Sequence, residues 1–135
     1  MKEAKQVIVM RKFKCRTGKL IAQGSHSSLG VILQEMRKNQ INHPNGDISL
    51  TLDIKKDSAM DCWINGRFTK ICVYVNTEEE LINVYNKAKA KNLPCVMITD
   101  AGLTEFHNIP TNTCIAIGPC FVEEFEGITD KLPLY

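Results

Sequence analysis

Short, continuous apolar runs recur along the chain and predict the strands of a buried sheet. They are Gln6–Met10, Thr69–Val75, Pro94–Thr99 and Thr113–Ile117, and Gly118-Pro119 closes the last one. Runs without polar alternation are typical of strands covered on both faces. Helix-connected strands favour a parallel core, while the short third-to-fourth connection permits an antiparallel pair.

The longest helical pattern covers about Gly18–Asn39, with Thr17 as a candidate N-cap. Apolar residues recur on one face of this helix, which predicts that this face packs on the core. They are Ile21, Ala22, Leu29, Ile32 and Met36.

Two further helices are predicted after the second strand. Thr77-Glu78-Glu79-Glu80 is a capping-box pattern that opens a helix to about Lys91. Its apolar stripe is Leu81, Val84, Tyr85 and Ala88. A short amphipathic helix is expected over about Phe121–Thr129.

The segment Ile41–Arg67 predicts an excursion from this alternation. Asn45-Gly46 and Asn65-Gly66 are turn signals. Between them, apolar residues alternate with polar ones, which indicates a half-buried strand in a hairpin-like insertion. These residues are Ile48, Leu50, Leu52 and Ile54. The predicted order is β-α-(excursion)-β-α-β-β-α, in a single α/β domain of residues 1–135.

Composition places the chain among ordinary globular proteins. It has 135 residues, of which 44% are hydrophobic and 24% charged. No apolar run approaches the roughly 18–20 residues that span a bilayer. The N-terminal stretch is too short in apolar residues for a signal peptide, so we expect a cytoplasmic protein.

The six cysteines, by their spacing, predict neither a metal site nor a disulfide framework. They are Cys15, Cys62, Cys72, Cys95, Cys114 and Cys120, with no CxxC pair and none at metal-ligand spacing from a histidine. Cys72, Cys95 and Cys114 lie in apolar runs, so we expect them to pack as small buried apolar residues.

The net charge of +2 is unevenly distributed along the chain. Basic residues dominate the N-terminal part, whereas acids gather in Glu78–Glu80 and Glu123–Glu126. The basic residues include Arg11, Lys12, Lys14, Arg16 and Lys19. Such a field attracts a polyanion, although a merely solvated basic surface fits equally well.

Lys19, Gln23 and His26 fall on one stripe of the first helix, because they are spaced four and three residues apart. The first turn of a helix normally prefers acids. Lys19 therefore indicates either an anion site at the helix start or a side chain that simply reaches water. A histidine such as His26 on a half-buried stripe is usually structural.

A second candidate segment, Thr99–Thr104, begins where a predicted strand ends. Ligands of α/β sheets gather at the carboxyl ends of parallel strands. Here Asp100 is a candidate base, Gly102 allows close backbone approach and Thr104 offers a hydroxyl. A plain strand-to-turn junction explains the same residues.

These two segments match sequence motifs of a known family. The stretch Gly18–His26 resembles the GK-x-x-AQ-x-x-H signature of type 2 peptidyl-tRNA hydrolases. Thr99–Thr104 is similar to that family's DAG-x-T motif, and Thr113–Pro119 to its T-x-x-x-I-G-P strand. The ending Lys131–Tyr135 resembles the family's K-L-x-L-Y end. The motifs occur in the right order and span nearly the whole chain.

The resemblance implies a four-stranded mixed β-sheet flanked by helices in three α/β/α layers, often as a homodimer. It implies hydrolysis of the ester that joins a peptide to tRNA, with no metal or organic cofactor. Residues at the family's functional positions are Lys19, Gln23, Asp100, Thr104 and Thr113, with His26 and Gly102 as supporting residues.

The chemistry of these residues suits ester hydrolysis, which passes through an oxyanion. Asp100 with Thr104 would orient and deprotonate water, and Lys19 would stabilise the oxyanion or hold tRNA. Gln23 and Thr113 would position these groups. The basic residues Arg11, Lys12, Lys14 and Arg16 would contact the tRNA backbone and make binding salt-sensitive.

A non-catalytic RNA- or protein-binding module on the same fold is the alternative. Leu103, where the family usually has a basic residue, and the excursion over residues 41–67 favour it. Joint retention of the lysine, the amide, the carboxylate and both threonines favours the enzyme, because a binding module need not keep that set.

Overall fold

Four strands form one mixed sheet in the computed structural model, which describes residues 2–101 and 109–135. Their order across the sheet is β4 (Thr69–Val75), β1 (Ala4–Arg11), β6 (Thr111–Phe121) and β5 (Cys95–Asp100). β1 is parallel to β4, and β6 is antiparallel to both β1 and β5. The predicted mixed sheet is confirmed. Since β1, β4 and β5 run in the same direction, their carboxyl ends share one edge.

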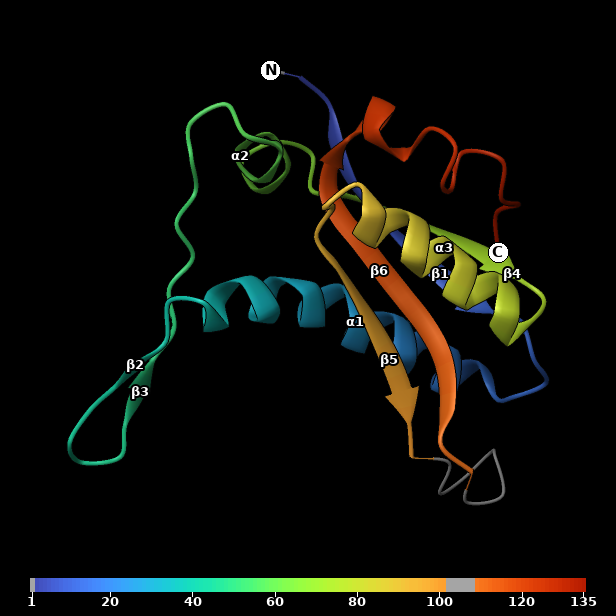
Figure 1. Cartoon of the computed structure of the whole chain (residues 1–135), viewed down its shortest axis with the longest axis horizontal. Coiled ribbons are helices and arrows are strands. Elements are labelled where there is room, and N and C mark those ends of the chain that lie inside the picture. The colour runs from blue at the N-terminus through green and yellow to red at the C-terminus, as the bar shows by residue number, and fades with distance from the viewer. Residues whose placement is uncertain (1, 102–108) are drawn as a thin grey trace.

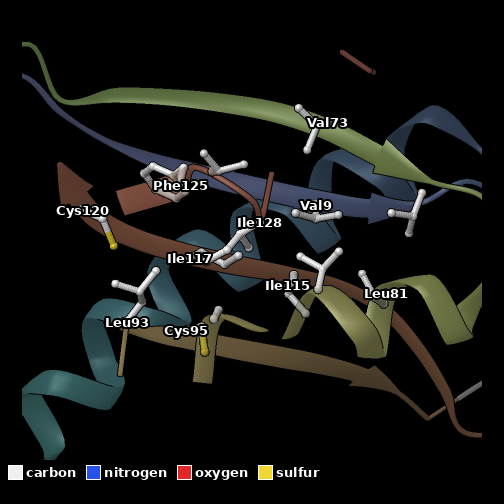
Figure 2. Packing of buried hydrophobic residues seen from close by; sticks show 14 residues of the cluster. Val9, Val73, Leu81, Leu93, Cys95, Ile115, Ile117, Cys120, Phe125 and Ile128 are labelled. Carbon is white, nitrogen blue, oxygen red and sulfur yellow. The ribbon is translucent and has the colours of Figure 1, made fainter. Parts of the chain in front are cut away.

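Helices cover both faces of this sheet and make three layers, as predicted (Figure 1). α1 (Thr17–Arg37) lies on one face and α3 (Glu78–Ala90) on the other. The larger buried cluster lies between α3 and the sheet, where Val9, Ile115 and Leu81 meet (Figure 2). All three are fully buried, so the continuous apolar runs of the sequence do mark strands covered on both sides.

The start of α3 follows directly from the local sequence. Thr77 is the N-cap, and its hydroxyl accepts a hydrogen bond from the backbone N–H of Glu80 at 3.1 Å. Acids fill the first turn and lysines the last, which complements the helix dipole. The predicted stripe is confirmed, since Leu81, Val84 and Ala88 are buried.

The orientation of α1 differs from the prediction. The face that packs on the sheet consists of Gln23, Ser27 and Val31, whereas Ile21 is 65% and Leu29 59% exposed. Apolar periodicity therefore identified the packed face only in part, since Ile32 packs against the cluster around Trp63 but Ile21 and Leu29 do not face the core. Polar groups are tolerated on the buried face because each finds a hydrogen-bond partner. The N-cap is Arg16 rather than Thr17, and it makes no side-chain capping bond.

The C-terminal part also departs from the prediction. β6 does not stop at Gly118-Pro119 but continues to Phe121, with a register shift opposite Lys5 and Val7. The helix expected over Phe121–Thr129 is instead a single 3₁₀ turn, η1 (Val122–Phe125), followed by turns. Phe125 fills the end of the core from this turn. This single turn is enough to place the Phe125 ring in the core, and a longer helix does not form.

The excursion forms an arm and a short helix. β2 (Ile41–Asn42) and β3 (Ile48–Ser49) pair around the Asn45-Gly46 turn and project from the body (Figure 1). The half-buried strand predicted from Ile48 to Ile54 is limited to these two β3 residues. The chain then returns through α2 (Ala59–Ile64), where Ser58 is the N-cap. No helix in the described residues is long and apolar enough to cross a bilayer.

Trp63 anchors α2 to the sheet. Its ring is 2% exposed and its indole N–H donates to the carbonyl oxygen of Thr69 at 2.7 Å. The burial of so large an apolar side chain stabilises α2 on β1 and β6, where it packs with Ala4 and Phe121. The excursion is therefore fixed at its second end, while the arm lies in solvent.

The cysteines are all free thiols. Burial raises the pKa of Cys114 to about 11, and burial together with nearby Glu124 raises that of Cys120 to about 12. At pH 8 only about one Cys114 thiol in a thousand is ionised, and the thiolate is the reactive form. We therefore expect iodoacetamide to leave both residues unmodified in the native protein and to modify them after urea denaturation. Peptide mass mapping before and after denaturation measures this, and rapid native modification of either would contradict it.

Candidate active site

Lys19, Gln23 and Asp100 meet at the edge where β5 ends. The ammonium of Lys19 donates to Oδ2 of Asp100 at 2.7 Å, and Nε2 of Gln23 donates to the same oxygen at 2.9 Å. The Lys19 and Asp100 side chains are only 14% and 13% exposed. Lys19 and Gln23 of the stripe predicted on α1 and the carboxylate predicted at a strand end therefore belong to one cluster.

A bulge in β6 brings Thr113 into the same cluster. Ile98 lies opposite Cys114 and Thr99 opposite Asn112, so Thr113 is the extra residue of β6. Its buried hydroxyl donates to Oε1 of Gln23 at 3.0 Å. Bulges re-aim side chains in this way beside functional sites. A chain of hydrogen bonds thus runs from Thr113 through Gln23 to Asp100.

The position of α1 over the sheet depends on a buried glutamine. Gln6 on β1 is 0% exposed, and its Oε1 accepts from the hydroxyl of Ser28 on α1 at 2.5 Å. Its Nε2 donates to the carbonyl oxygens of Ser28 and Gly118. Cys114 adds a contact, because its thiol donates to the backbone carbonyl of Gln23 at 3.3 Å. These bonds fix the register of the helix that carries Lys19 and Gln23.

A second polar network lies on the α3 face at this edge, and sequence reasoning missed it. Nδ2 of Asn112 donates to Glu78 at 3.0 Å, and Thr99 donates to Oδ1 of Asn112 at 2.7 Å. Glu78 also pairs with Arg11 at 3.6 Å. Only the strand-end position of Thr99 hinted at this role, since the four residues come from four elements.

The remaining predicted residues have different placements. His26 is exposed, and its imidazole makes no hydrogen bond within the described residues, so its supporting role stays a prediction. Gly102 and Thr104 lie outside the described residues. Lys12, Lys14 and Arg16 are exposed on the connection between β1 and α1, whereas Arg11 is half-buried.

The cluster has the chemistry of a hydrolytic site. An ammonium group such as that of Lys19 can stabilise negative charge that develops on a substrate oxygen. A carboxylate fixed by two donors can orient water. Among residues 2–101 and 109–135, no three His, Cys, Asp or Glu side chains are grouped as metal ligands would be.

Fold and site together define a class: an α/β protein with a paired lysine and carboxylate at the carboxyl edge of its sheet. The sequence model of the family described as "Peptidyl-tRNA hydrolase PTH2" matches residues 4–135. The chain belongs to this family. The peptidyl-tRNA hydrolase of Methanocaldococcus jannaschii is 37% identical over 131 residues, which cover 96% of this chain and 98% of that protein. That of Nanoarchaeum equitans is 35% identical over 131 residues, covering 97% and 98%.

A solved structure supports the fold alone. A protein of unknown function, Atu0240 from Agrobacterium tumefaciens str. C58, superposes with a TM-score of 0.58. The match covers 100% of this chain and 99% of that one at 10% sequence identity.

Proposed function

We propose that this chain, acting as one domain over residues 1–135, hydrolyses the ester that joins a peptidyl or N-blocked aminoacyl group to tRNA. The observation that carries the proposal is the bonding of Lys19 and Gln23 to one carboxylate oxygen of Asp100. Family membership supports the same reaction. A non-catalytic binding module would not need this half-buried charge pair, whose desolvation is costly.

In the proposed reaction, water attacks the ester carbonyl carbon while Asp100, assisted by Thr104, takes its proton. The carbonyl electrons move to oxygen, and the Lys19 ammonium stabilises that oxyanion. The oxyanion then collapses, the ester C–O bond breaks, and the tRNA hydroxyl leaves with the proton that Asp100 took from water, which returns Asp100 to its carboxylate form. The products are a free peptide carboxylic acid and tRNA. Gln23, oriented by Thr113, keeps Asp100 in the productive position.

Incubation of the purified protein with an N-blocked aminoacyl-tRNA tests the activity. We expect release of free tRNA and of the N-blocked amino acid in equal amounts. Binding of tRNA without any hydrolysis would instead support the non-catalytic alternative. The affinity for tRNA should fall as the salt concentration rises, because Lys12, Lys14 and Arg16 are proposed to contact phosphates.

We also propose that the protein is cytoplasmic, because a peptidyl-tRNA substrate would be met there.

We further propose that the protein is a homodimer formed through the exposed flank of α1. A groove of about 460 Å³ lies between α1, α2 and the sheet, on the side of α1 away from Asp100. Leu29 and Phe68, which are 59% and 49% exposed, line it. With Ile64, which is 36% exposed, they form an apolar patch beside α2 that a second copy of the chain would cover. Gly24 and Ser28 allow a second helix to approach closely.

Replacement of Leu29 by glutamate should convert the dimer into a monomer, because the new charge would be buried at the interface. Sedimentation equilibrium measures the mass. Ile82→Glu is the matched control, since Ile82 is also an exposed aliphatic residue of a helix but lies on α3, across the sheet. A wild-type monomer at micromolar concentration, or identical masses for both variants, would contradict the proposal.

A further inference from the structure

Two tyrosines and a lysine form a small cluster beside β4, one of the two outer strands of the sheet. The rings of Tyr74 and Tyr135 lie edge to face with their centroids 5.6 Å apart. The Lys12 ammonium lies 4.5 Å from the centroid of Tyr74 and 5.8 Å from that of Tyr135. Tyr135 is 47% exposed, so its ring is available to a ligand. We refer to these three residues as the tyrosine platform.

The C-terminal tail holds the platform rigidly. The backbone N–H of Tyr74 donates to the carbonyl oxygen of Pro133, and that of Tyr135 donates to Cys72, both at 3.1 Å. Val73 and Leu134 form an antiparallel bridge between them. The tail therefore pairs with the outer side of β4 through a single β-bridge, and a ring held in this way loses little entropy when it stacks on a ligand.

The platform and the Lys19–Asp100 pair both lie where the parallel strands of the sheet have their carboxyl ends. The backbone N–H of Lys12 donates to the carbonyl oxygen of Val75, the last residue of β4. Asp100 ends β5, three strand positions away in the order β4-β1-β6-β5. At about 4.8 Å per strand, the ends of β4 and β5 are roughly 14 Å apart, and Tyr135, one position outside β4, is roughly 19 Å from Asp100. Tyr135 also lines one groove with Thr17, the first residue of α1.

Positive charge surrounds the platform. Lys14 and Arg16 are exposed between Lys12 and α1, and the first turn of α1 contains no acid. The N-terminus of α1 adds the positive end of its dipole. Exposed aromatic rings set among cations are the features with which proteins bind single-stranded nucleic acid, because bases stack on the rings and phosphates meet the cations.

We propose that the tyrosine platform binds the unpaired 3′ strand of the RNA, with a base stacked on Tyr135 and Lys12 paired to the adjoining phosphate. This inference rests on the proposed function, which places the scissile ester at the last nucleotide of that strand. Stacking roughly 19 Å from Asp100 would fix the strand upstream of the ester. The platform thus supplies substrate affinity, while the Lys19–Asp100 pair supplies chemistry.

The deciding variants are Tyr135→Leu, which keeps an apolar side chain without a π-face, and Tyr135→Phe, which keeps the ring. For an N-blocked aminoacyl-tRNA, KM should rise about tenfold in Tyr135→Leu and less than twofold in Tyr135→Phe, since stacking on one base is worth about 1–3 kcal/mol. Tyr85→Leu is the control, because Tyr85 is also capped by a lysine, Lys89, but lies on α3. An unchanged KM in Tyr135→Leu, or an equal rise in Tyr85→Leu, overturns the proposal.

Binding without turnover separates this inference from the proposed function. The probe is a fluorescein-labelled single-stranded RNA hexamer, compared with a hexamer that has the same phosphates and three abasic sites at its 3′ end. Wild-type protein should bind the complete hexamer several-fold more tightly, and Tyr135→Leu should abolish that difference. Equal affinity of wild-type protein for both hexamers overturns the platform. Base-dependent binding by a protein that hydrolyses no ester would overturn the proposed function alone.

Discussion

Asp100→Asn should lower kcat/KM for an N-blocked aminoacyl-tRNA by a factor of about 10³ and leave the fold intact. A positioned general base contributes about 10²–10⁴ in rate, and asparagine cannot accept a proton from water. Asparagine has nearly the shape of aspartate, so the site does not open. Release of free tRNA over time measures the effect, with circular dichroism as the check on folding.

A control for lost charge comes from a second ion pair. Lys2 and Glu123 also form a salt bridge, but both side chains are more than half exposed and lie far from the strand ends that form the site. Glu123→Gln should therefore leave turnover within twofold of wild type. If Asp100→Asn kept more than a tenth of the wild-type activity, Asp100 would not be the base.

Lys19, the partner of Asp100, is expected to contribute to the same step. Lys19→Met keeps the apolar stem and removes the charge that is proposed to stabilise the oxyanion, a change worth about 10²–10³ in kcat. Because Lys19 and Asp100 bind each other at 2.7 Å, each single variant also leaves a half-buried charge without its partner. The double variant should consequently lose much less than the product of the two single losses, as residues that act as a unit do.

Local sequence signals predicted the elements that depend on neighbours in the chain. The β4 range Thr69–Val75 agrees with the predicted strand. Its apolar run is continuous, so the prediction did not depend on choosing which face of the strand is buried. The cap of α3 was equally readable, because Thr77 and Glu80 interact across three residues. The strand-end position singled out Asp100, and the first helical turn Lys19, as candidates only, and their roles stay a prediction.

Interactions between distant elements were not predictable from the pattern. The packed face of α1 carries Gln23 and Ser27, whose burial is acceptable only because partners arrive from elsewhere, such as Thr113 of β6. Periodicity selects the most apolar face, and in α1 two large members of that face, Ile21 and Leu29, are exposed. The bulge that aims Thr113 depends on the register of two strands, which no local motif encodes.

Gly118→Ala should destabilise the protein by about 3 kcal/mol or more, although the change adds a single methyl group. Gly118 has φ +103°, a conformation that L-residues avoid. A Cβ there would lie 2.8 Å from the carbonyl oxygen of Lys5 and 2.9 Å from the backbone nitrogen of Cys120. Both atoms belong to paired strands inside the sheet, so neither can move without breaking ladder hydrogen bonds.

The loss should extend to the site, because the carbonyl oxygen of Gly118 accepts from Gln6 at 3.3 Å, and Gln6 binds Ser28 of α1. Urea unfolding followed by tryptophan fluorescence measures the free energy, since Trp63 is the single, buried reporter. Gly46→Ala is the matched control: Gly46 also has positive φ, +95°, but its Cβ would contact nothing within 4 Å. Positive φ alone costs about 1–2 kcal/mol. If the two variants lost equal stability, the backbone contact at Gly118 would not be what excludes a side chain.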